Sequence, residues 1–343
     1  MSRRILVWMH APDYPIWQVP RASLERIREA AGGTFEVATL EEPLHASGDG
    51  ADEVPASLLD AIRDAEVYVG FGIPREAFRA AERLRWVHSG AAGVGGSLYP
   101  EMRESDVTFT NSAGLHAETL AEHAMALMLH FGRGLDVAAS AADERRWAHR
   151  ELAGAGSPVR ELAGRAVGVV GYGGIGSAVG RRAAAFGMRV LATRRSPAEQ
   201  PPEVARMWGP SGLSELLRAS DVVVLSVPET GETRGMIGAR ELEMLGEAGV
   251  LINVSRGDIV DEDALVEALR WNRIRGAGLD VFEEEPLPPD SPLWGLENVV
   301  ITPHTGAVSP RFWERETALI VENLRRYRAD RPLRNLVDKE RGY

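Results

Sequence analysis

The sequence predicts an α/β fold with parallel sheets, divided into two domains. Short apolar segments typical of buried strands alternate with helical segments along almost the whole chain. Apolar strands that are separated by helices imply a parallel sheet covered by helices on both faces. The chain of 343 residues is longer than one typical domain, and 44% of it is hydrophobic, enough to build substantial cores.

The first part of the chain, to about Thr110, predicts a small α/β unit. Its expected elements are a strand over Ile5–Trp8, a helix over Ala22–Ala31, a strand over Val67–Val69, a helix from near Pro74 and a strand over Leu84–His88. Gly32 and Gly33 mark the end of the first helix, because glycine readily adopts the backbone conformation that follows a helix.

The second part begins with a long helix over Glu118–Phe131, predicted from the spacing of its apolar residues. The segment Asp136–Pro158 has no clear pattern. From Ala166 the alternation is regular again. The expected strands are Val167–Val170, Arg189–Ala192, Asp221–Val227, Val250–Val254, Gly278–Phe282 and Val299–Thr302, and the expected helices are Ile175–Phe186, Leu213–Ala219 and Asp261–Trp271. One topology consistent with this pattern returns the last helix, Ser309–Arg328, to the first domain.

Composition excludes several classes of function. Asp and Glu total 50 against 39 Lys and Arg, so the net charge is -11, which disfavours nucleic acid and anionic membranes as partners. With no cysteine, there are no disulfides, thiolate metal sites or cysteine nucleophiles. The apolar N-terminal run is too short for a secretory signal, and no run of about 18 apolar residues predicts a membrane span. We expect a cytoplasmic protein.

A glycine motif indicates a dinucleotide site. Gly171, Gly173 and Gly176 fit the pattern G-x-G-x-x-G, directly after the apolar strand Val167–Val170 and at the start of a helix. The first glycine permits a tight turn, the second allows a pyrophosphate close to the backbone, and the third allows close packing of helix on strand. The N-terminus of the helix offers N–H groups and positive potential to the phosphates.

Polar side chains follow three later strands. Arg256, Glu285 and His304 each lie just beyond one of them. Because ligands of open α/β sheets bind at the carboxyl ends of the strands, we expect these three side chains to meet at one site.

Together these segments resemble the D-isomer-specific 2-hydroxyacid dehydrogenase family, and among its members the glyoxylate/hydroxypyruvate reductases in broad type. The resemblance covers about Val87 to His304, and the stretches Val87–Val94, Thr110–Gly114 and Val227–Gly235 also match. It implies two Rossmann-like domains with the active site in the cleft between them. The substrate domain would be discontinuous, 1–112 plus 306–343, and the dinucleotide-binding domain would be 113–305.

The resemblance also implies roles for the three polar residues. Arg256 would bind the substrate carboxylate, which its planar guanidinium matches in bidentate fashion. His304 would be the general acid/base that protonates the carbonyl oxygen of a small 2-oxo acid and deprotonates the 2-hydroxy acid in reverse. Glu285 would orient His304 and favour its protonated form. Ala92, Gly93 and Val94 would offer backbone N–H groups to the substrate carboxylate. The protein would be a homodimer, with the segment Asp136–Pro158 in its interface.

The residues expected to bind the dinucleotide follow the strands of the second domain: Gly171, Gly173, Gly174, Ile175, Gly176, Arg194, Arg195, Ser196, Val227, Pro228, Thr233, Val254, Ser255, Asp280, His304 and Gly306. Asp280 would contact the nicotinamide end. The acid that usually binds the adenosine ribose of NAD is missing, since Arg194 and Arg195 follow the second strand and the next carboxylate is Glu199. We therefore expect NADP(H) to be favoured, with NAD(H) as the alternative.

Two other functions are compatible with these motifs. A formate or phosphite dehydrogenase on the same scaffold is one, and a dinucleotide-sensing binding protein of the corepressor type is another. His116, His123 and His130 recur every seven residues, a spacing too long for adjacent metal ligands, so packing is favoured and no metal is expected. Asp261 is interpreted as a helix N-cap.

Overall fold

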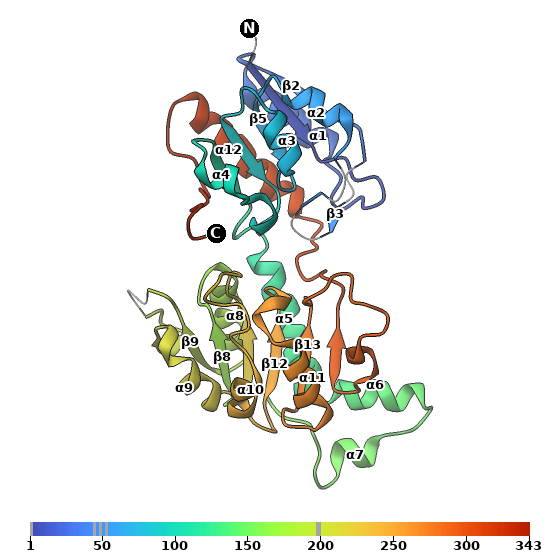
Figure 1. Cartoon of the computed structure of the whole chain (residues 1–343). Helices are drawn as coiled ribbons and strands as arrows, with labels where there is room; N and C mark the ends of the chain where they lie inside the picture. The colour runs from blue at the N-terminus through green and yellow to red at the C-terminus, as the bar shows by residue number, and fades with distance from the viewer. Residues whose placement is uncertain (1–2, 44–45, 48–49, 52–53, 197–199) are drawn as a thin grey trace. The chain divides into compact units, whose positions relative to one another are not determined.

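The computed structural model describes residues 3–43, 46–47, 50–51, 54–196 and 200–343. The chain forms two compact units (Figure 1). Unit 1 contains Met1–His116 and Val308–Tyr343, and unit 2 contains Ala117–Ala307. Each unit is built on one parallel sheet, which confirms the predicted fold class.

The sheet of unit 1 has five strands in the order β2-β1-β5-β6-β7. They are β1 (Arg3–Trp8), β2 (Phe35–Thr39), β5 (Ala65–Gly70), β6 (Trp86–Ser89) and β7 (Thr108–Asn111), and the helices are α1 (Arg21–Ala31), α2 (Ala56–Ile62), α3 (Arg75–Ala80), α4 (Pro100–Glu104) and α12 (Phe312–Arg328). A short hairpin, β3 (Ala46–Ser47) with β4 (Gly50–Ala51), lies outside this sheet. Side chains of α1 and α12 pack on one face of the sheet, and those of α2, α3 and α4 pack on the other.

The last helix belongs to unit 1, as one topology predicted. Phe312, Ile320 and Leu324 of α12 are buried with residues of α1 and β1. The helix begins three residues later than predicted. Ser309 instead forms a turn, in which its carbonyl accepts the N–H of Phe312 and its hydroxyl accepts the N–H of Arg311.

The sheet of unit 2 has seven strands in the order β10-β9-β8-β11-β12-β13-β14. They are β8 (Ala166–Val170), β9 (Arg189–Thr193), β10 (Val204–Trp208), β11 (Val222–Leu225), β12 (Val250–Asn253), β13 (Gly276–Leu279) and β14 (Val299–Ile301), and the main helices are α5 (Ala117–Gly132), α8 (Gly174–Ala185), α9 (Leu213–Arg218), α10 (Ala239–Leu245) and α11 (Glu262–Arg270). The strand order reverses at β8, which has β9 on one side and β11 on the other. Crevices for ligands form at such a reversal, outside the carboxyl ends of the strands.

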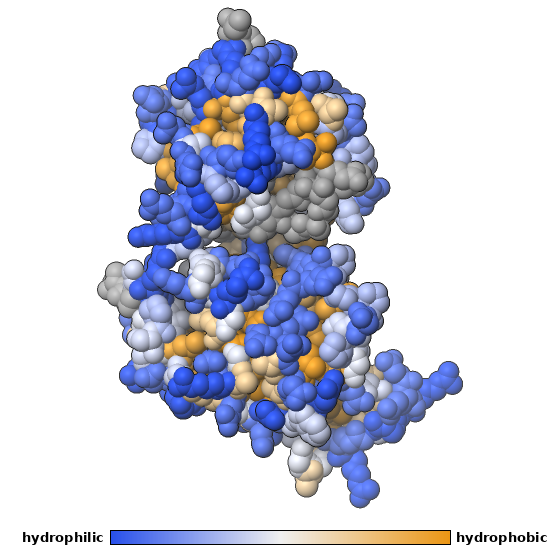
Figure 2. All heavy atoms as spheres, viewed as in Figure 1, coloured by the Kyte–Doolittle hydropathy of each residue, from blue (hydrophilic) through white to orange (hydrophobic). Residues whose placement is uncertain are grey.

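Alternate residues of the unit 2 strands face opposite layers of helices. Val167 and Val169 of β8 are buried with α5 and α8, whereas Ala166 and Val170 lie in the core formed with α9, α10 and α11. Both faces of the sheet are therefore covered, as expected for a parallel sheet. On the face drawn in Figure 2, apolar side chains are visible only as patches among hydrophilic ones.

The segment without a clear sequence pattern forms two helices, α6 (Leu135–Asp143) and α7 (His149–Ala153). We call Leu135–Pro158 the arm. It extends away from the sheet of unit 2 (Figure 1), and an ion pair between Asp136 and Arg275 ties its base to that unit. Trp147, near its middle, is 90% exposed.

Several boundaries differ from the predictions. Strand β13 was predicted over Gly278–Phe282 but ends at Leu279, because Asp280 and Phe282 are used in loop contacts that are described below. Strands β2, β7 and β10 and helices α2 and α10 were not predicted. The N-cap prediction is confirmed, since Asp261 Oδ1 accepts the N–H of Ala264 at 2.9 Å. No helix in the described ranges is long and apolar enough to cross a membrane.

Candidate active site

Three neighbouring strands of unit 2 end in the polar segments singled out by sequence. Arg256 follows β12, Asp280 and Glu285 follow β13, and His304 follows β14. Since β12, β13 and β14 are adjacent and parallel, their carboxyl ends lie at one edge of the sheet. The fold thus brings these loops together.

His304 and Glu285 form a direct pair. The Nδ1 atom of the imidazole lies 2.7 Å from Oε2 of Glu285. The other carboxylate oxygen of Glu285 accepts the backbone N–H of Phe282 at 3.0 Å. Both side chains are partly exposed, 33% for His304 and 26% for Glu285. Glu285 therefore sets the direction of a ring that solvent or a ligand can reach.

Asp280 holds the loop that carries His304. Its carboxylate is 1% exposed, and it accepts hydrogen bonds from the hydroxyl of Thr302 and from the N–H groups of Thr305 and Gly306. Its backbone carbonyl also accepts the N–H of His304 at 2.9 Å. The loop is consequently fixed on both sides of His304, whose φ of 52° lies in the left-handed region.

Arg256 is positioned by a tight crossing of two loops. The side-chain amide of Asn253 donates to the Arg256 carbonyl at 2.9 Å, and its Oδ1 accepts from both the N–H and the hydroxyl of Ser255. A Cβ atom at Gly257 would collide with the backbone of Phe282. Glycine at this position therefore lets the Arg256 loop reach the loop that supports Glu285.

The electrostatics of the pair follow from these contacts. The hydrogen bond and charge of Glu285 raise the pKa of His304 above its ordinary value, against the opposing effects of burial and of Arg256. Burial alone would raise the pKa of Glu285, but His304, the Phe282 N–H and Arg256 together hold it below the ordinary value. These shifts both favour a carboxylate beside a protonated imidazole.

The glycine motif has the geometry of a phosphate-binding turn. Gly171 has a φ of 94°, and a Cβ atom there would lie 2.6 Å from Val227. A Cβ atom at Gly176 would collide with the Gly171 carbonyl, whereas one at Gly173 would point into open space. Gly173 has no side chain to cap α8, which leaves the first-turn N–H groups for a ligand. These residues fit a dinucleotide pyrophosphate.

The other residues expected near a dinucleotide also lie at this edge of the sheet. Arg194, Arg195 and Ser196 are exposed at the end of β9, while Glu199 lies outside the described residues. After β11, the Thr233 hydroxyl donates to the Pro228 carbonyl at 2.7 Å, which fixes the turn that follows Val227. Val254 and Ser255 are buried after β12.

In unit 1, the loop Ala91–Val94 presents unpaired N–H groups. The carbonyl of Ala91 accepts the N–H of Ser112, and the carbonyl of Ala92 accepts the side-chain amide of Asn111. The Val94 carbonyl accepts the N–H of Ser97. The N–H groups of Ala92, Gly93 and Val94 have no hydrogen-bond partner within the described ranges of unit 1. Consecutive free N–H groups of this kind suit an anion.

Sequence reasoning missed three supporting side chains of unit 2, namely Asn253, Thr302 and His123. The imidazole of His123 lies 3.0 Å from the Thr302 hydroxyl and 3.7 Å from Asp280. His116 lies seven residues earlier in the sequence and stacks on Phe312 in unit 1, so the three histidines do not meet at one site. No group of three acidic or histidine side chains that could hold a metal is present among the described residues. Asn253 is the last residue of β12 and Thr302 directly follows β14, so a search for polar residues at strand ends would have found both.

Comparisons with known proteins agree with this geometry. The model of the family "D-isomer specific 2-hydroxyacid dehydrogenase, NAD binding domain" matches residues 125–306. The glyoxylate reductase of Korarchaeum cryptofilum is 38% identical over 300 residues, which covers 84% of this chain and 88% of that protein.

Two solved structures are similar along almost their whole length. The D-isomer specific 2-hydroxyacid dehydrogenase of Xanthobacter autotrophicus, in complex with NADPH, is 31% identical with a TM-score of 0.80 and 99% of both chains covered. The NADPH-dependent glyoxylate/hydroxypyruvate reductase of Sinorhizobium meliloti, in complex with NADP and malonate, is 31% identical with a TM-score of 0.74, covering 100% of this chain and 98% of that one. The present chain thus belongs to the D-isomer specific 2-hydroxyacid dehydrogenase family, and it is an NAD(P)-dependent oxidoreductase that interconverts small 2-oxo acids and 2-hydroxy acids.

Proposed function

We propose that this enzyme reduces a small 2-oxo acid of the glyoxylate or hydroxypyruvate type with NADPH, and that Arg256, Glu285 and His304 are its catalytic residues. The observation that carries the proposal is the His304–Glu285 pair at 2.7 Å, on strands adjacent to the one that precedes Arg256. The names of the glyoxylate reductase relatives support the substrate class.

His304 is the proton donor in this proposal. When bound, the reduced nicotinamide supplies a hydride. Glu285 binds Nδ1 of His304, so the opposite nitrogen, Nε2, carries the proton that passes to the substrate carbonyl oxygen. Because Glu285 raises the pKa of the imidazole, it favours the protonated ring, which can give its proton to the substrate in reduction and take it back in the reverse reaction.

The substrate carboxylate is bound by groups that recognise anions. Arg256 offers a planar, permanently charged guanidinium. The unpaired N–H groups of Ala92, Gly93 and Val94 are the second candidate, since the carbonyls of Ala92 and Val94 accept hydrogen bonds from other groups of unit 1.

The dinucleotide is held along the carboxyl ends of β8, β9 and β11. Gly171–Gly176 and the N-terminus of α8 bind the pyrophosphate, and Val227, Pro228 and Thr233 border the site. Arg194, Arg195 and Ser196 replace the usual acid at the end of β9, and guanidinium groups suit a 2′-phosphate. Val254, Ser255, Asp280 and Gly306 lie toward the nicotinamide end. Asp280 is buried and bonded to the loop, so it acts there by fixing Gly306.

We also propose a homodimer whose interface contains the arm. Two helices that extend from unit 2, with an indole that is 90% exposed at Trp147, suit burial against a second copy. The arm spans the segment Asp136–Pro158 predicted for the interface. A cytoplasmic location stays a prediction from the sequence.

The first prediction concerns the pH dependence of reduction. The protonated form of His304 is active in reduction, so the rate falls as pH rises through the pKa of the imidazole. Glu285→Gln removes the carboxylate that raises this pKa, and the fall should then occur at lower pH.

His304→Ala should lower kcat by about 10² to 10⁴ with dinucleotide affinity retained. The measurement is kcat against pH for wild type and both variants. An unshifted profile for Glu285→Gln, or near-wild-type kcat for His304→Ala, would contradict the assigned roles.

The second prediction concerns carboxylate recognition. Arg256→Lys should raise KM for the oxo acid by about tenfold or more, because an ammonium cannot form the bidentate pair. Arg270→Lys, on the exposed end of α11, is the matched control and should leave KM unchanged. Steady-state kinetics at saturating NADPH provide the test. If the two variants have the same KM, Arg256 does not bind the carboxylate.

The third prediction concerns the choice of dinucleotide. The ratio of kcat/KM for NADPH to that for NADH should exceed one, and Arg194→Asp should reverse it, since the new carboxylate repels a 2′-phosphate. Arg189→Asp makes the same charge change at the opposite end of β9 and should leave the ratio in place. A wild-type ratio at or below one would refute the preference for NADPH.

The fourth prediction concerns assembly. Sedimentation velocity at micromolar concentration should show a dimer, and Trp147→Ser should weaken it, because a buried tryptophan commonly contributes ~2 kcal/mol or more to an interface. Trp271→Ser changes another exposed indole, outside the arm, and should leave the dimer intact. A monomeric wild-type protein would count against the proposed interface.

A further inference from the structure

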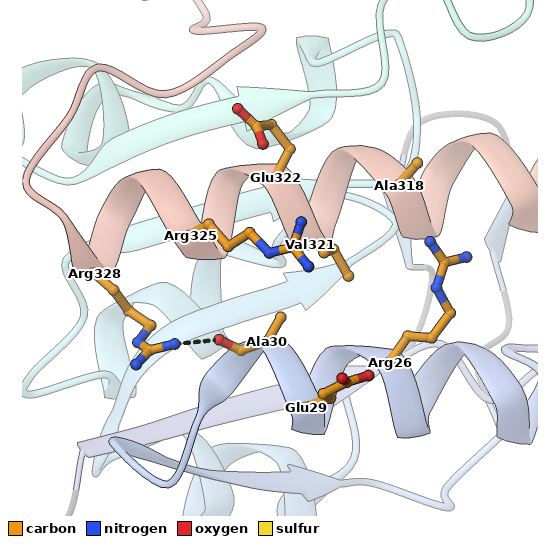
Figure 3. A pocket seen from close by; sticks show the side chains of 8 residues that line it. All are labelled: Arg26, Glu29, Ala30, Ala318, Val321, Glu322, Arg325 and Arg328. Carbon is orange, nitrogen blue, oxygen red and sulfur yellow. Dashed lines mark hydrogen bonds between the residues drawn. The ribbon is translucent and has the colours of Figure 1, made fainter.

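Unit 1 buries a carboxylate that the proposed chemistry does not use. Glu316 lies on α12 with 0% exposure, and glutamate is almost never fully buried unless it is paired. Glu322 on the same helix shows the ordinary case. It lines a groove of about 340 Å³ between α12 and α1 (Figure 3) and is paired with Arg326 at 2.6 Å. Glu316 faces the sheet instead, so its burial calls for partners.

Both oxygens of Glu316 have such partners on the sheet. Oε1 lies 2.9 Å from Nε2 of His88, the third residue of β6, and Oε2 accepts the hydroxyl of Ser112 at 2.6 Å. The other nitrogen of His88 lies 2.9 Å from the Thr110 hydroxyl, which also accepts the indole N–H of Trp86 at 2.8 Å. All the ring nitrogens and carboxylate oxygens of this network are satisfied inside the core.

The network continues into the loop Ala91–Val94. Ser112 not only donates to Glu316 but also uses its N–H to bind the Ala91 carbonyl at 3.2 Å. Ser89, the residue after His88, accepts the N–H of Ala91 at 3.1 Å through its hydroxyl. Glu316 therefore binds Ser112, which fixes the Ala91 carbonyl, and His88, whose neighbour Ser89 fixes the Ala91 N–H. Fixing Ala91 in turn directs the N–H groups that follow it.

We propose that Glu316 is a positioning residue for substrate binding, which acts through Ser112 and His88 to hold the loop Ala91–Val94 with its N–H groups available to the substrate carboxylate. This inference rests on the function proposed for that loop. It assigns a role in substrate recognition to a side chain that is fully buried and that lies 204 residues from Ser112 in the sequence.

Glu316→Gln tests this inference with the least change in shape. An amide has one accepting oxygen, so only one of the hydrogen bonds from His88 and Ser112 keeps its direction, and the other must be replaced by one that the amide N–H donates. We expect KM for the oxo acid to rise about tenfold, equivalent to ~1.4 kcal/mol, with kcat within about twofold of wild type. The dissociation constant for NADPH, measured by fluorescence titration, should not change.

Thr317→Val is the matched control. Thr317 is the next residue on α12, is equally buried, and donates to Ser23 of α1 at 2.7 Å, away from the loop. Loss of the Thr317 hydroxyl should lower the melting temperature of the protein without changing KM for the oxo acid. A merely structural role for Glu316 would make the two variants alike, and equal effects on KM would overturn the inference.

Ser112→Ala covers the case in which Glu316→Gln does not fold. It removes the hydroxyl that Glu316 binds but keeps the backbone N–H that binds Ala91. It should raise KM in the same direction as Glu316→Gln, and an unchanged KM would overturn the inference. Absence of oxo-acid turnover in the wild-type enzyme would overturn the proposed function as well, so the two failures are distinguishable.

Discussion

The backbone of His304 depends on one buried carboxylate, that of Asp280. A non-glycine residue with a φ of 52° costs on the order of 1–3 kcal/mol and persists only where its surroundings enforce it. Here the Asp280 carbonyl binds the N–H of His304, and its carboxylate binds the N–H groups of Thr305 and Gly306. The imidazole is thereby directed at Glu285 before any ligand arrives. This preorganisation lowers the conformational cost of the proton transfer that we assign to the pair.

Each unit uses the same device at the carboxyl ends of its strands. In unit 2, Asp280 binds the loop that carries His304, and in unit 1, Glu316 binds the residues that hold the loop Ala91–Val94. Both carboxylates are nearly or fully inaccessible, at 1% and 0% exposure. A buried acid is costly unless all its oxygens are bonded, and this cost enforces one loop conformation. Loops at strand ends are otherwise the least constrained parts of such folds.

The features of the fold that depend on local sequence pattern could be predicted. The central strand β8 is apolar along its length because both faces are covered, and its alternation with helices identified the fold. The edge strand β10 was missed because a strand with one open side tolerates exposed residues such as Arg206. Arg256, Glu285 and His304 were selected as candidates by their position after strands. The bond from Glu316 to His88 joins residues 228 positions apart, and no local pattern encodes such a pairing.

The acidity of the chain and its anionic ligands are compatible for a physical reason. A net charge of -11 repels anions at long range, but salt screens that repulsion within about 8 Å at physiological ionic strength. Binding is therefore decided by groups in contact with the ligand. In the proposed function these groups are the first turn of α8, the N–H groups of Ala92–Val94, and the guanidinium groups of Arg194 and Arg256, which all present positive potential. All four depend on backbone conformation or permanent charge and none on lysine, so they keep their sign across the pH range in which His304 titrates. With the catalytic roles that we propose, the pH dependence of catalysis reports the His304–Glu285 pair rather than loss of ligand binding.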